Sequence, residues 1–265
     1  MYPIITLTTD FGEQDSYVGQ MKGAILSVQP RVQLVDLNHQ IPPQRIVAGA
    51  FELWRAWRAF PLHTVHVAVV DPGVGTARRI IAAHIKGHFF VLPDNGLLSF
   101  ILAEESVEEV VEVADPRFWR STVSHTFHGR DIMGPVAAHI ASGVPLRKLG
   151  GELDAADLVM LESRLQDGDR RDRPFRCEVL HVDRFGNVVL PVRGELSGGG
   201  RTIHVSIDGT SLALPAARCY GEVPNGALVL ITGSSGLWEI AKAGGSAAEH
   251  LGVEVGSEVE LDTGR

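Results

Sequence analysis

Three side chains, Asp71, Arg78 and His128, are of the types needed to hold and activate a water molecule. Asp71 directly follows the apolar run Val67–Val70, and Arg78 lies further along the same glycine-containing loop. An arginine keeps its positive charge, so it can pair with a carboxylate and lower the pKa of that carboxylate. A histidine beside the pair could orient a water or remove its proton, because its pKa lies near neutral pH.

Plainer interpretations of these residues remain open. Asp71 could end a strand in a capped turn, and His128 could be an ordinary loop residue among the eleven histidines. Open α/β sheets, however, place ligand-binding groups at the carboxyl ends of their strands. Asp10 occupies such a strand end and could accept two hydrogen bonds from a ribose diol, or cap the next helix. Asp94 and Asn95 follow another strand and are further candidates for substrate binding.

Polar residues near the C-terminus could bind the other parts of a nucleoside-containing substrate. Asn187 and Phe185 suit an adenine, which an amide can hydrogen-bond and an aromatic ring can stack on; a hairpin turn with the Phe packed beneath it is the alternative. Asp183 belongs to the same turn. A later stretch begins with Ser234 and Ser235, and its hydroxyls and backbone N–H groups could bind an amino-acid carboxylate. Glu239, in the same stretch, could meet an ammonium group.

The spacing of residues gives little support for a metal site or a phosphate-binding site. The pairs His63/His66 and His125/His128 lack the third nearby ligand that zinc sites show, so we expect no metal. The loop Gly73–Thr76 is shorter than a P-loop and has no lysine before its threonine, which argues against a nucleotide-triphosphate site.

Composition excludes several classes of partner. The 24 basic and 32 acidic residues give a net charge of −8 with no basic stripe, which argues against nucleic acid. No apolar run approaches the roughly 18 residues that span a bilayer, and Met1–Ile5 lacks the features of a leader, so we expect no membrane partner and a cytoplasmic location. Cys177 and Cys219 are expected to be reduced, half-buried thiols, with one disulfide left open as an alternative.

Alternating strands and helices predict an α/β N-terminal domain, residues 1–165, with a mainly parallel sheet. If the sheet is parallel, the polar loops after its strands gather at one edge and form a single cleft. Strands are expected at 4–9, 33–37, 64–70, 80–85, 88–92 and 107–113, and helices at 16–28, 45–60, 97–103 and about 132–141.

The composition changes after this domain. Residues 166–174 are charged and predicted to be a structureless linker. Short strands and turns at even spacing then predict a smaller C-terminal antiparallel β-barrel over residues 175–265. Its seven strands are expected at 175–183, 187–192, 202–207, 211–214, 227–232, 237–241 and 258–261.

Six motifs in order, taken together, resemble the S-adenosylmethionine (SAM) hydroxide adenosyltransferase family, which is related to fluorinases and chlorinases. One of them alone would be a weak signal, but the six extend over nearly the whole chain. They are TTDFG at 8–12, DPGVGTARR at 71–79, PDNG at 93–96, FHGRD at 127–131, DRFGN at 183–187 and SSGLWEIA at 234–241.

The resemblance implies an enzyme that uses water or hydroxide to displace L-methionine from C5′ of SAM, giving adenosine. It also implies a homotrimer whose sites lie between the first domain of one subunit and the second domain of its neighbour. SAM would then be the substrate, with no cofactor. Matching residues imply catalytic roles for Asp71, Arg78 and His128, and leave open whether His128 takes a proton or the other two orient the water. They imply substrate-binding roles for Asp10, Asp183, Phe185, Asn187, Ser234 and Ser235.

The halogenating relatives are similar around these motifs but differ where the chemistry occurs. They carry a Tyr in place of both Asp71 and His128, and a halide-binding Ser where Gly129 stands. Because a carboxylate at Asp71 would repel an anion, the sequence predicts a water-using enzyme. The halogenases also carry an Arg aligned with Ser235, so carboxylate binding here is expected from hydroxyls or backbone N–H groups. A SAM- or adenosine-binding regulatory protein with negligible turnover and a halogenase are the alternatives.

Overall fold

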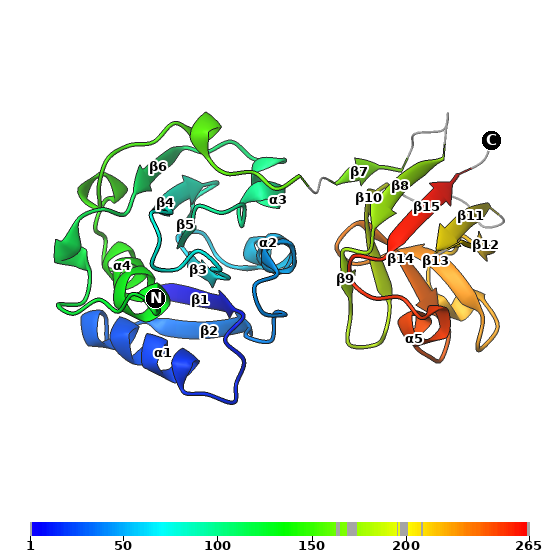
Figure 1. Cartoon of the computed structure of the whole chain (residues 1–265), viewed down its shortest axis with the longest axis horizontal. Helices are drawn as coiled ribbons and strands as arrows, with labels where there is room; N and C mark the ends of the chain where they lie inside the picture. The colour runs from blue at the N-terminus through cyan, green and yellow to red at the C-terminus, as the bar shows by residue number, and fades with distance from the viewer. Residues whose placement is uncertain are drawn as a thin grey trace. The chain divides into compact units, whose positions relative to one another are not determined.

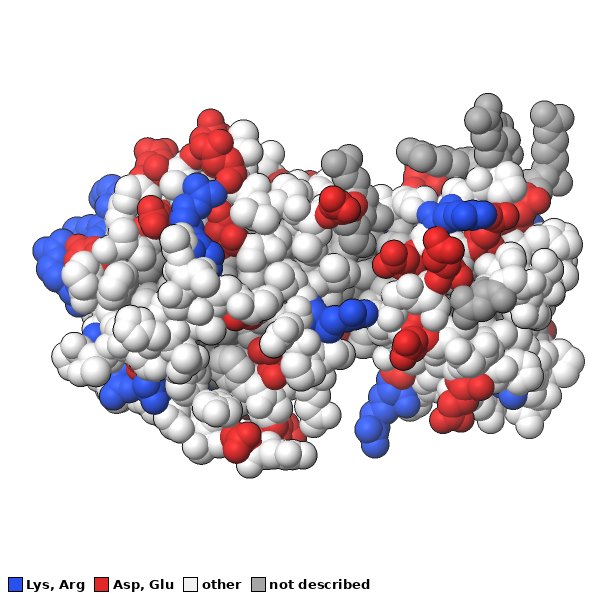
Figure 2. Space-filling model, viewed as in Figure 1, with Lys and Arg blue, Asp and Glu red and all other residues white. Residues whose placement is uncertain are grey.

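The computed structural model describes residues 2–162, 165–168, 174–194, 196, 201–207 and 209–263. They form two compact units, Met1–Glu162 and Ser163–Arg265 (Figure 1). Both cysteines are free; Cys177 is buried and Cys219 is exposed, so neither is half-buried as predicted. Burial raises the pKa of the Cys177 thiol to about 12. On the face drawn in Figure 2, acidic and basic side chains are interspersed. Within the described residues, no helix combines the length and apolar character needed to cross a membrane.

The first unit is built on a six-stranded sheet of order β2-β1-β3-β5-β4-β6. As predicted, the sheet is mainly parallel: β1 runs parallel to β2 and β3, and β3 runs parallel to β5. Only β4 runs against its neighbours, because Lys86 and Gly87 have positive φ and turn the chain directly into β5. The strands are β1 (Ile4–Thr9), β2 (Gln33–Asn38), β3 (Val65–Val69), β4 (Ile80–Ile85), β5 (His88–Pro93) and β6 (Glu109–Glu112).

Helices cover both faces of this sheet (Figure 1). On one face, α1 (Tyr17–Val28) and α4 (Gly134–Ala141) pack on alternate residues of the central strands, including Leu7 and Val67. The other face carries α2 (Ile46–Ala56) and α3 (Ser99–Leu102). Gly49 permits the close approach of α2, since a Cβ there would lie 2.8 Å from the Val70 side chain. The central strands are therefore buried on both faces, as their unbroken apolar runs predicted.

A chain of buried polar side chains crosses the α2 face of the sheet. His66 is fully buried, and its Nδ1 lies 2.8 Å from Thr6 Oγ1. Its Nε2 lies 3.2 Å from Nδ1 of His88, which in turn meets the edge of the Trp57 ring. Burial, with a smaller contribution from His88, lowers the pKa of His66 to about 3. His66 is therefore neutral in the folded protein at every pH above that value.

The described residues of the second unit form two sheets. The first has the order β13-β14-β10-β7, with β9 also paired to β10, and the second has the order β12-β11-β15-β8. All pairs are antiparallel except β7 with β10. The strands are β7 (Gln166–Asp167), β8 (Phe175–Glu178), β9 (His181–Val182), β10 (Val188–Arg193), β11 (Thr202–Ile207), β12 (Thr210–Pro215), β13 (Leu228–Thr232), β14 (Leu237–Lys242) and β15 (Glu258–Asp262).

Four details differ from the sequence prediction. The single strand expected over 175–183 is two strands, β8 and β9. The described strands form two separate sheets that share an apolar core instead of a closed barrel. Residues 166–167, predicted to be linker, are β7, whereas 169–173 lie outside the described residues. A short helix, α5 (Ala247–Leu251), was not predicted; Ser246 caps it by accepting a hydrogen bond from the Glu249 N–H, and Gly252 ends it in the left-handed conformation.

The buried histidine makes stability depend on pH. In the unfolded chain His66 binds a proton near pH 6.5, but in the folded protein only near pH 3, so the unfolded state binds more protons between these values. The free energy of unfolding should therefore fall as the pH falls, by about 2 kcal/mol from His66 between pH 6.5 and 5. Urea unfolding followed by tryptophan fluorescence measures this slope. His66→Gln should have a shallower slope, and an unchanged slope would contradict the assignment.

Candidate active site

The loop after β3 folds back so that its end meets its beginning. Asp71 O accepts a hydrogen bond from the Val74 N–H, and Gly73 O accepts from both the N–H and the hydroxyl of Thr76. The Thr76 hydroxyl in turn accepts from the Arg78 N–H at 3.3 Å. These successive turns return Arg78 to the end of the strand, beside Asp71.

A second loop packs tightly against this one at Gly75. Gly75 has φ of +79°, and a Cβ there would lie 2.3 Å from the backbone oxygen of His125. Only glycine fits this position without displacing backbone. The loop that carries Asp71 and Arg78 therefore lies against the segment that leads to His128.

Arg78 joins the other two members of the predicted trio. Its Nε lies 3.1 and 3.0 Å from the two carboxylate oxygens of Asp71, and its Nη2 lies 2.5 Å from Asp71 Oδ2. The same Nη2 lies 2.8 Å from Nδ1 of His128. Both side chains of the ion pair are largely buried, with 12% of Arg78 and 4% of Asp71 exposed. Low exposure and this geometry make the pair much stronger than a surface ion pair.

The contact with Arg78 determines how His128 is protonated. A guanidinium can only donate hydrogen bonds, so His128 Nδ1 must accept one and the proton of the neutral ring must lie on Nε2. Burial lowers the pKa of His128, and the positive charge of Arg78 lowers it further, whereas Asp71 and Asp131 oppose the shift. His128 is therefore neutral at neutral pH and presents an N–H donor.

Asp71 and His128 line a cavity of about 280 Å³ at the carboxyl edge of the sheet. Asp10 lies in the same wall; its Oδ2 accepts a hydrogen bond from the backbone N–H of Gln44, a residue with a positive φ of 64°. Its Oδ1 accepts none from the residues that the structure describes, so it can receive a ligand hydroxyl. The remaining wall is largely apolar, formed by Phe11, Pro43, Val69, Pro72, Val74, Thr126, Phe127 and Gly129.

A second hollow of about 580 Å³ shares four wall residues with the first: Asp10, Phe11, Thr126 and Phe127. The rings of Phe11, Tyr17 and Phe127 meet here at centroid distances of 5.3 to 6.1 Å. Both hollows fall near or within the size range of small-molecule sites. The first unit alone thus offers a continuous surface with acids, an N–H donor and aromatic rings, of which Tyr17 is exposed.

Asp94 and Asn95 do not line either hollow. Arg79 donates to Asp94 Oδ2 from Nε and Nη2, and the backbone N–H of Val159 donates to Oδ1. Asn95 donates to the backbone oxygen of Val70, the residue before Asp71. Both side chains are thus engaged within the protein, and Asn95 supports the strand end that carries Asp71. Their predicted contact with substrate stays a prediction.

In the second unit, Asp183 organises the turn that carries the predicted adenine-binding residues. Its Oδ1 accepts from the backbone N–H groups of Phe185 and Asn187, and its Oδ2 accepts from the Asn187 side-chain amide. Gly186, at φ +82°, packs directly on Ser246. The Phe185 side chain is not packed beneath the turn; the residue is 78% exposed, which leaves the ring available for stacking.

The remaining predicted residues lie around a tight turn between β13 and β14. Ser234 is exposed, whereas Ser235 Oγ is buried without a hydrogen-bond partner among the described residues. Glu239 lies over Gly233, where a Cβ would meet its carboxylate. Tyr220 was not predicted from the sequence, but burial and the nearby acids Glu239 and Asp183 raise its pKa. The turn thus provides hydroxyls beside carboxylates.

Sequence reasoning also missed much of the cavity wall. Phe11, Phe127 and Gly129 stand inside the quoted motifs and could have been found there, but Gln44 and Tyr17 carry no such signal. Among the described residues, no group of three or more His, Cys, Asp or Glu is arranged to hold a metal ion.

Comparison with known proteins gives full-length similarity. Residues 5–150 match the SAM hydroxide adenosyltransferase N-terminal domain, and residues 177–260 match the C-terminal domain. The (R)-S-adenosyl-L-methionine hydrolase of Thermus thermophilus is 39% identical over 98% of this chain and 100% of the relative. A fluorinase from Nocardia brasiliensis is 29% identical over 99% of this chain and 97% of its own. An uncharacterised conserved protein from Thermotoga maritima has a solved structure that superposes with a TM-score of 0.90, at 33% identity, covering 97% of this chain and 99% of that chain.

The close contact of the two loops can be tested at Gly75. Gly75→Ala should suffer both from the left-handed backbone, at about 1–2 kcal/mol, and from overlap with His125 O. Gly143→Ala is the matched control in the same unit, since Gly143 also has a positive φ but has open space around its Cα. Urea unfolding should show a larger loss of stability for Gly75→Ala than for Gly143→Ala. Equal losses would show that the two loops can separate freely.

Proposed function

Because the chain belongs to the SAM hydroxide adenosyltransferase family, we propose that it is an enzyme that hydrolyses SAM to adenosine and L-methionine. The observation that carries the proposal is the hydrogen-bonded series Asp71–Arg78–His128, whose Asp71 and His128 line a hollow that Asp10 also lines. The relative's name specifies the (R) sulfonium epimer, and we propose the same epimer as the substrate here.

The reaction requires one bond to form and one to break. A water or hydroxide oxygen attacks C5′ of the ribose, and the C5′–S bond breaks with its electron pair going to sulfur, so that methionine leaves as a neutral thioether. One proton is released for each SAM consumed. A sulfonium is already a good leaving group, so the site needs no general acid. Its main task is to hold a poor nucleophile in line with the C5′–S bond, which can lower the barrier by about 7–11 kcal/mol.

The contacts of Arg78 indicate how the nucleophile is held. Both oxygens of Asp71 are occupied by Arg78, and Nδ1 of His128 accepts from the same guanidinium. Nδ1 of His128 is therefore not free to take a proton from water in this arrangement. His128 would instead donate its Nε2–H to the nucleophile oxygen, and the positive charge of Arg78 would favour its hydroxide form.

The hollow suits a cationic nucleoside. Phe11 and Phe127 line the hollow beside the carboxylate of Asp10, and the negative charge of Asp71 balances the positive charge of Arg78. Oδ1 of Asp10 is available for a ribose hydroxyl. On the same proposal, Phe185 and Asn187 contact the adenine, while Asp183, Ser234, Ser235 and Glu239 contact the methionine.

Further features of the proposal rest on the family resemblance. We propose a cytoplasmic homotrimer in which the second unit of a neighbouring subunit completes each site, with no metal or cofactor. The 78% exposure of Phe185 in the single chain supports a role in contacting substrate or another subunit.

Incubation with an epimeric mixture of SAM, followed by chromatography, tests the activity. The protein should release adenosine and methionine in equal amounts and leave the (S) epimer unconsumed. Asp71→Asn should be at least about 100-fold slower while still binding adenosine. The control is Asp115→Asn, which alters a similar Asp–Arg pair outside both hollows. Binding without turnover would indicate a regulatory protein, and a 5′-halo-adenosine formed with excess chloride or fluoride would indicate a halogenase.

The pH profile tests the state of His128. Protonation would place a proton on Nδ1 facing Arg78 and break that contact, so the neutral ring is the active form. Because burial and Arg78 lower the pKa of His128, despite the opposing charges of Asp71 and Asp131, the acid limb of kcat/KM should lie below pH 6.5. His125 is also close and acts in the same direction as Arg78. An acid limb centred above pH 6.5 that disappears in His128→Gln would contradict this account.

A further inference from the structure

A buried carboxylate outside both hollows holds together the segment that leads to His128. Asp131 is fully buried, yet it lines neither the cavity of Asp71 nor its neighbour. Burying a charge costs several kcal/mol unless it is well compensated. The position of Asp131 therefore requires an explanation from its surroundings.

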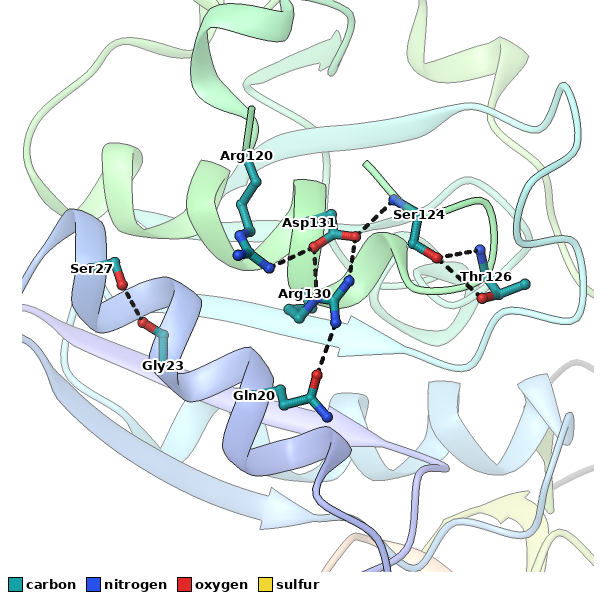
Figure 3. Close-up of polar contacts among 8 residues, drawn as sticks. All are labelled: Gln20, Gly23, Ser27, Arg120, Ser124, Thr126, Arg130 and Asp131. Carbon is teal, nitrogen blue, oxygen red and sulfur yellow. Dashed lines mark hydrogen bonds and ion pairs between the residues drawn. The ribbon is translucent and has the colours of Figure 1, made fainter. Parts of the chain in front are cut away.

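Four donors surround this carboxylate (Figure 3). Oδ1 accepts from Arg120 Nη1 at 3.1 Å and from Arg130 Nε at 2.7 Å. Oδ2 accepts from Arg130 Nη2 at 2.8 Å and from the backbone N–H of Ser124 at 2.9 Å. Burial alone would raise the pKa of Asp131, but the bonds from Arg130 and Ser124 lower it, so the group is ionised at neutral pH.

The backbone of Asp131 makes two more contacts with the same segment. Pro135, at the start of α4, has no N–H to give to the Asp131 oxygen four residues earlier. That oxygen instead accepts from the backbone N–H of Arg120 at 2.9 Å. The Asp131 N–H donates to Phe127 O at 3.1 Å. Asp131 lies within the π-helix Gly129–Met133, which begins directly after His128.

These contacts fix the segment at both of its ends. Arg120 and Ser124 are held to the start of the helix, and Ser124 Oγ also accepts from the Thr126 N–H (Figure 3). Between them and the helix, His125 O lies against Gly75 of the other loop. The two loops meet at this contact. Arg78 belongs to one loop and His128 follows the other, and the two side chains lie within hydrogen-bond distance.

We propose that Asp131 is a positioning residue for SAM hydrolysis: its bonds to Ser124 and Arg120 keep His128 in register with Arg78. This role rests on the proposed function, since it acts through the group that holds the nucleophile. Asp131→Asn keeps the shape of the side chain but replaces one carboxylate oxygen with an NH2 group. In either orientation of the amide, this NH2 group faces a guanidinium donor from which it cannot accept a hydrogen bond. The segment should then lose its fixed position.

Steady-state kinetics with SAM test the role. Asp131→Asn should lower kcat at least about tenfold and change KM less than about threefold, because Asp10, Asp71 and the wall residues outside 124–128 stay in place while the nucleophile is misplaced. Asp115→Asn is again the matched control and should behave as wild type. Unchanged kcat in Asp131→Asn would overturn the proposal. A decrease in activity that only matches the decrease in folded protein, with kcat per folded molecule unchanged, would also overturn the proposal.

Two further measurements keep the test decisive. If Asp131→Asn does not fold, Arg120→Gln removes one of the bonds to Asp131 from a half-exposed side chain. This variant should lower kcat about threefold with KM unchanged, and full activity would overturn the proposal.

Amide hydrogen exchange separates this proposal from the proposed function. Exchange over residues 124–128 should be faster in Asp131→Asn than in wild type, whether or not wild type turns over SAM, and equal exchange would contradict the positioning role.

Discussion

The site depends on one guanidinium that touches two side chains at once. Arg78 donates three hydrogen bonds to Asp71 from two nitrogens and a fourth to His128. Because arginine never accepts, this single arrangement fixes the ion pair, the tautomer of the histidine and the direction of its remaining N–H. A lysine could supply the charge but not this planar set of donors. The chemistry proposed for the chain follows from that constraint: the nucleophile meets a hydrogen-bond donor and a nearby positive charge, and the ring nitrogen that could act as a base is already occupied.

The fold satisfies the constraint with two loops and a sheet edge. Asn95 holds the backbone of Val70, the residue before Asp71, and successive turns bring Arg78 back to the same point. The second loop contacts the first at Gly75, where only a hydrogen fits. Asp131 then joins that second loop to the beginning of the helix. All of these contacts join residues of the first unit, so the arrangement of the three side chains is complete within it.

The sequence predicted the parts of this site that depend on residue type and order. Apolar runs that end in polar turns indicated a mainly parallel sheet with Asp10 and Asp71 at one edge, and motif order indicated Arg78 and His128. Packing could not be predicted in the same way. Asp94 directly follows an apolar strand, as Asp71 does, yet its carboxylate accepts hydrogen bonds from Arg79 and Val159. Phe185 looked equally able to pack beneath its turn, and the number of sheets in the second unit depends on long-range pairing. Likewise, Asp131 reads as an ordinary helix residue until Pro135 is seen to free its carbonyl oxygen.

The protonation state of His128 is the central claim, and it can be measured directly. Nitrogen-15 NMR of the histidine side chains, assigned with His128→Gln, distinguishes a bare ring nitrogen from a protonated one. We expect His128 at pH 7 to show a bare Nδ1 and a protonated Nε2, and Arg78→Lys to disturb this pattern. An imidazolium at pH 7, or a neutral ring with its proton on Nδ1, would contradict the account.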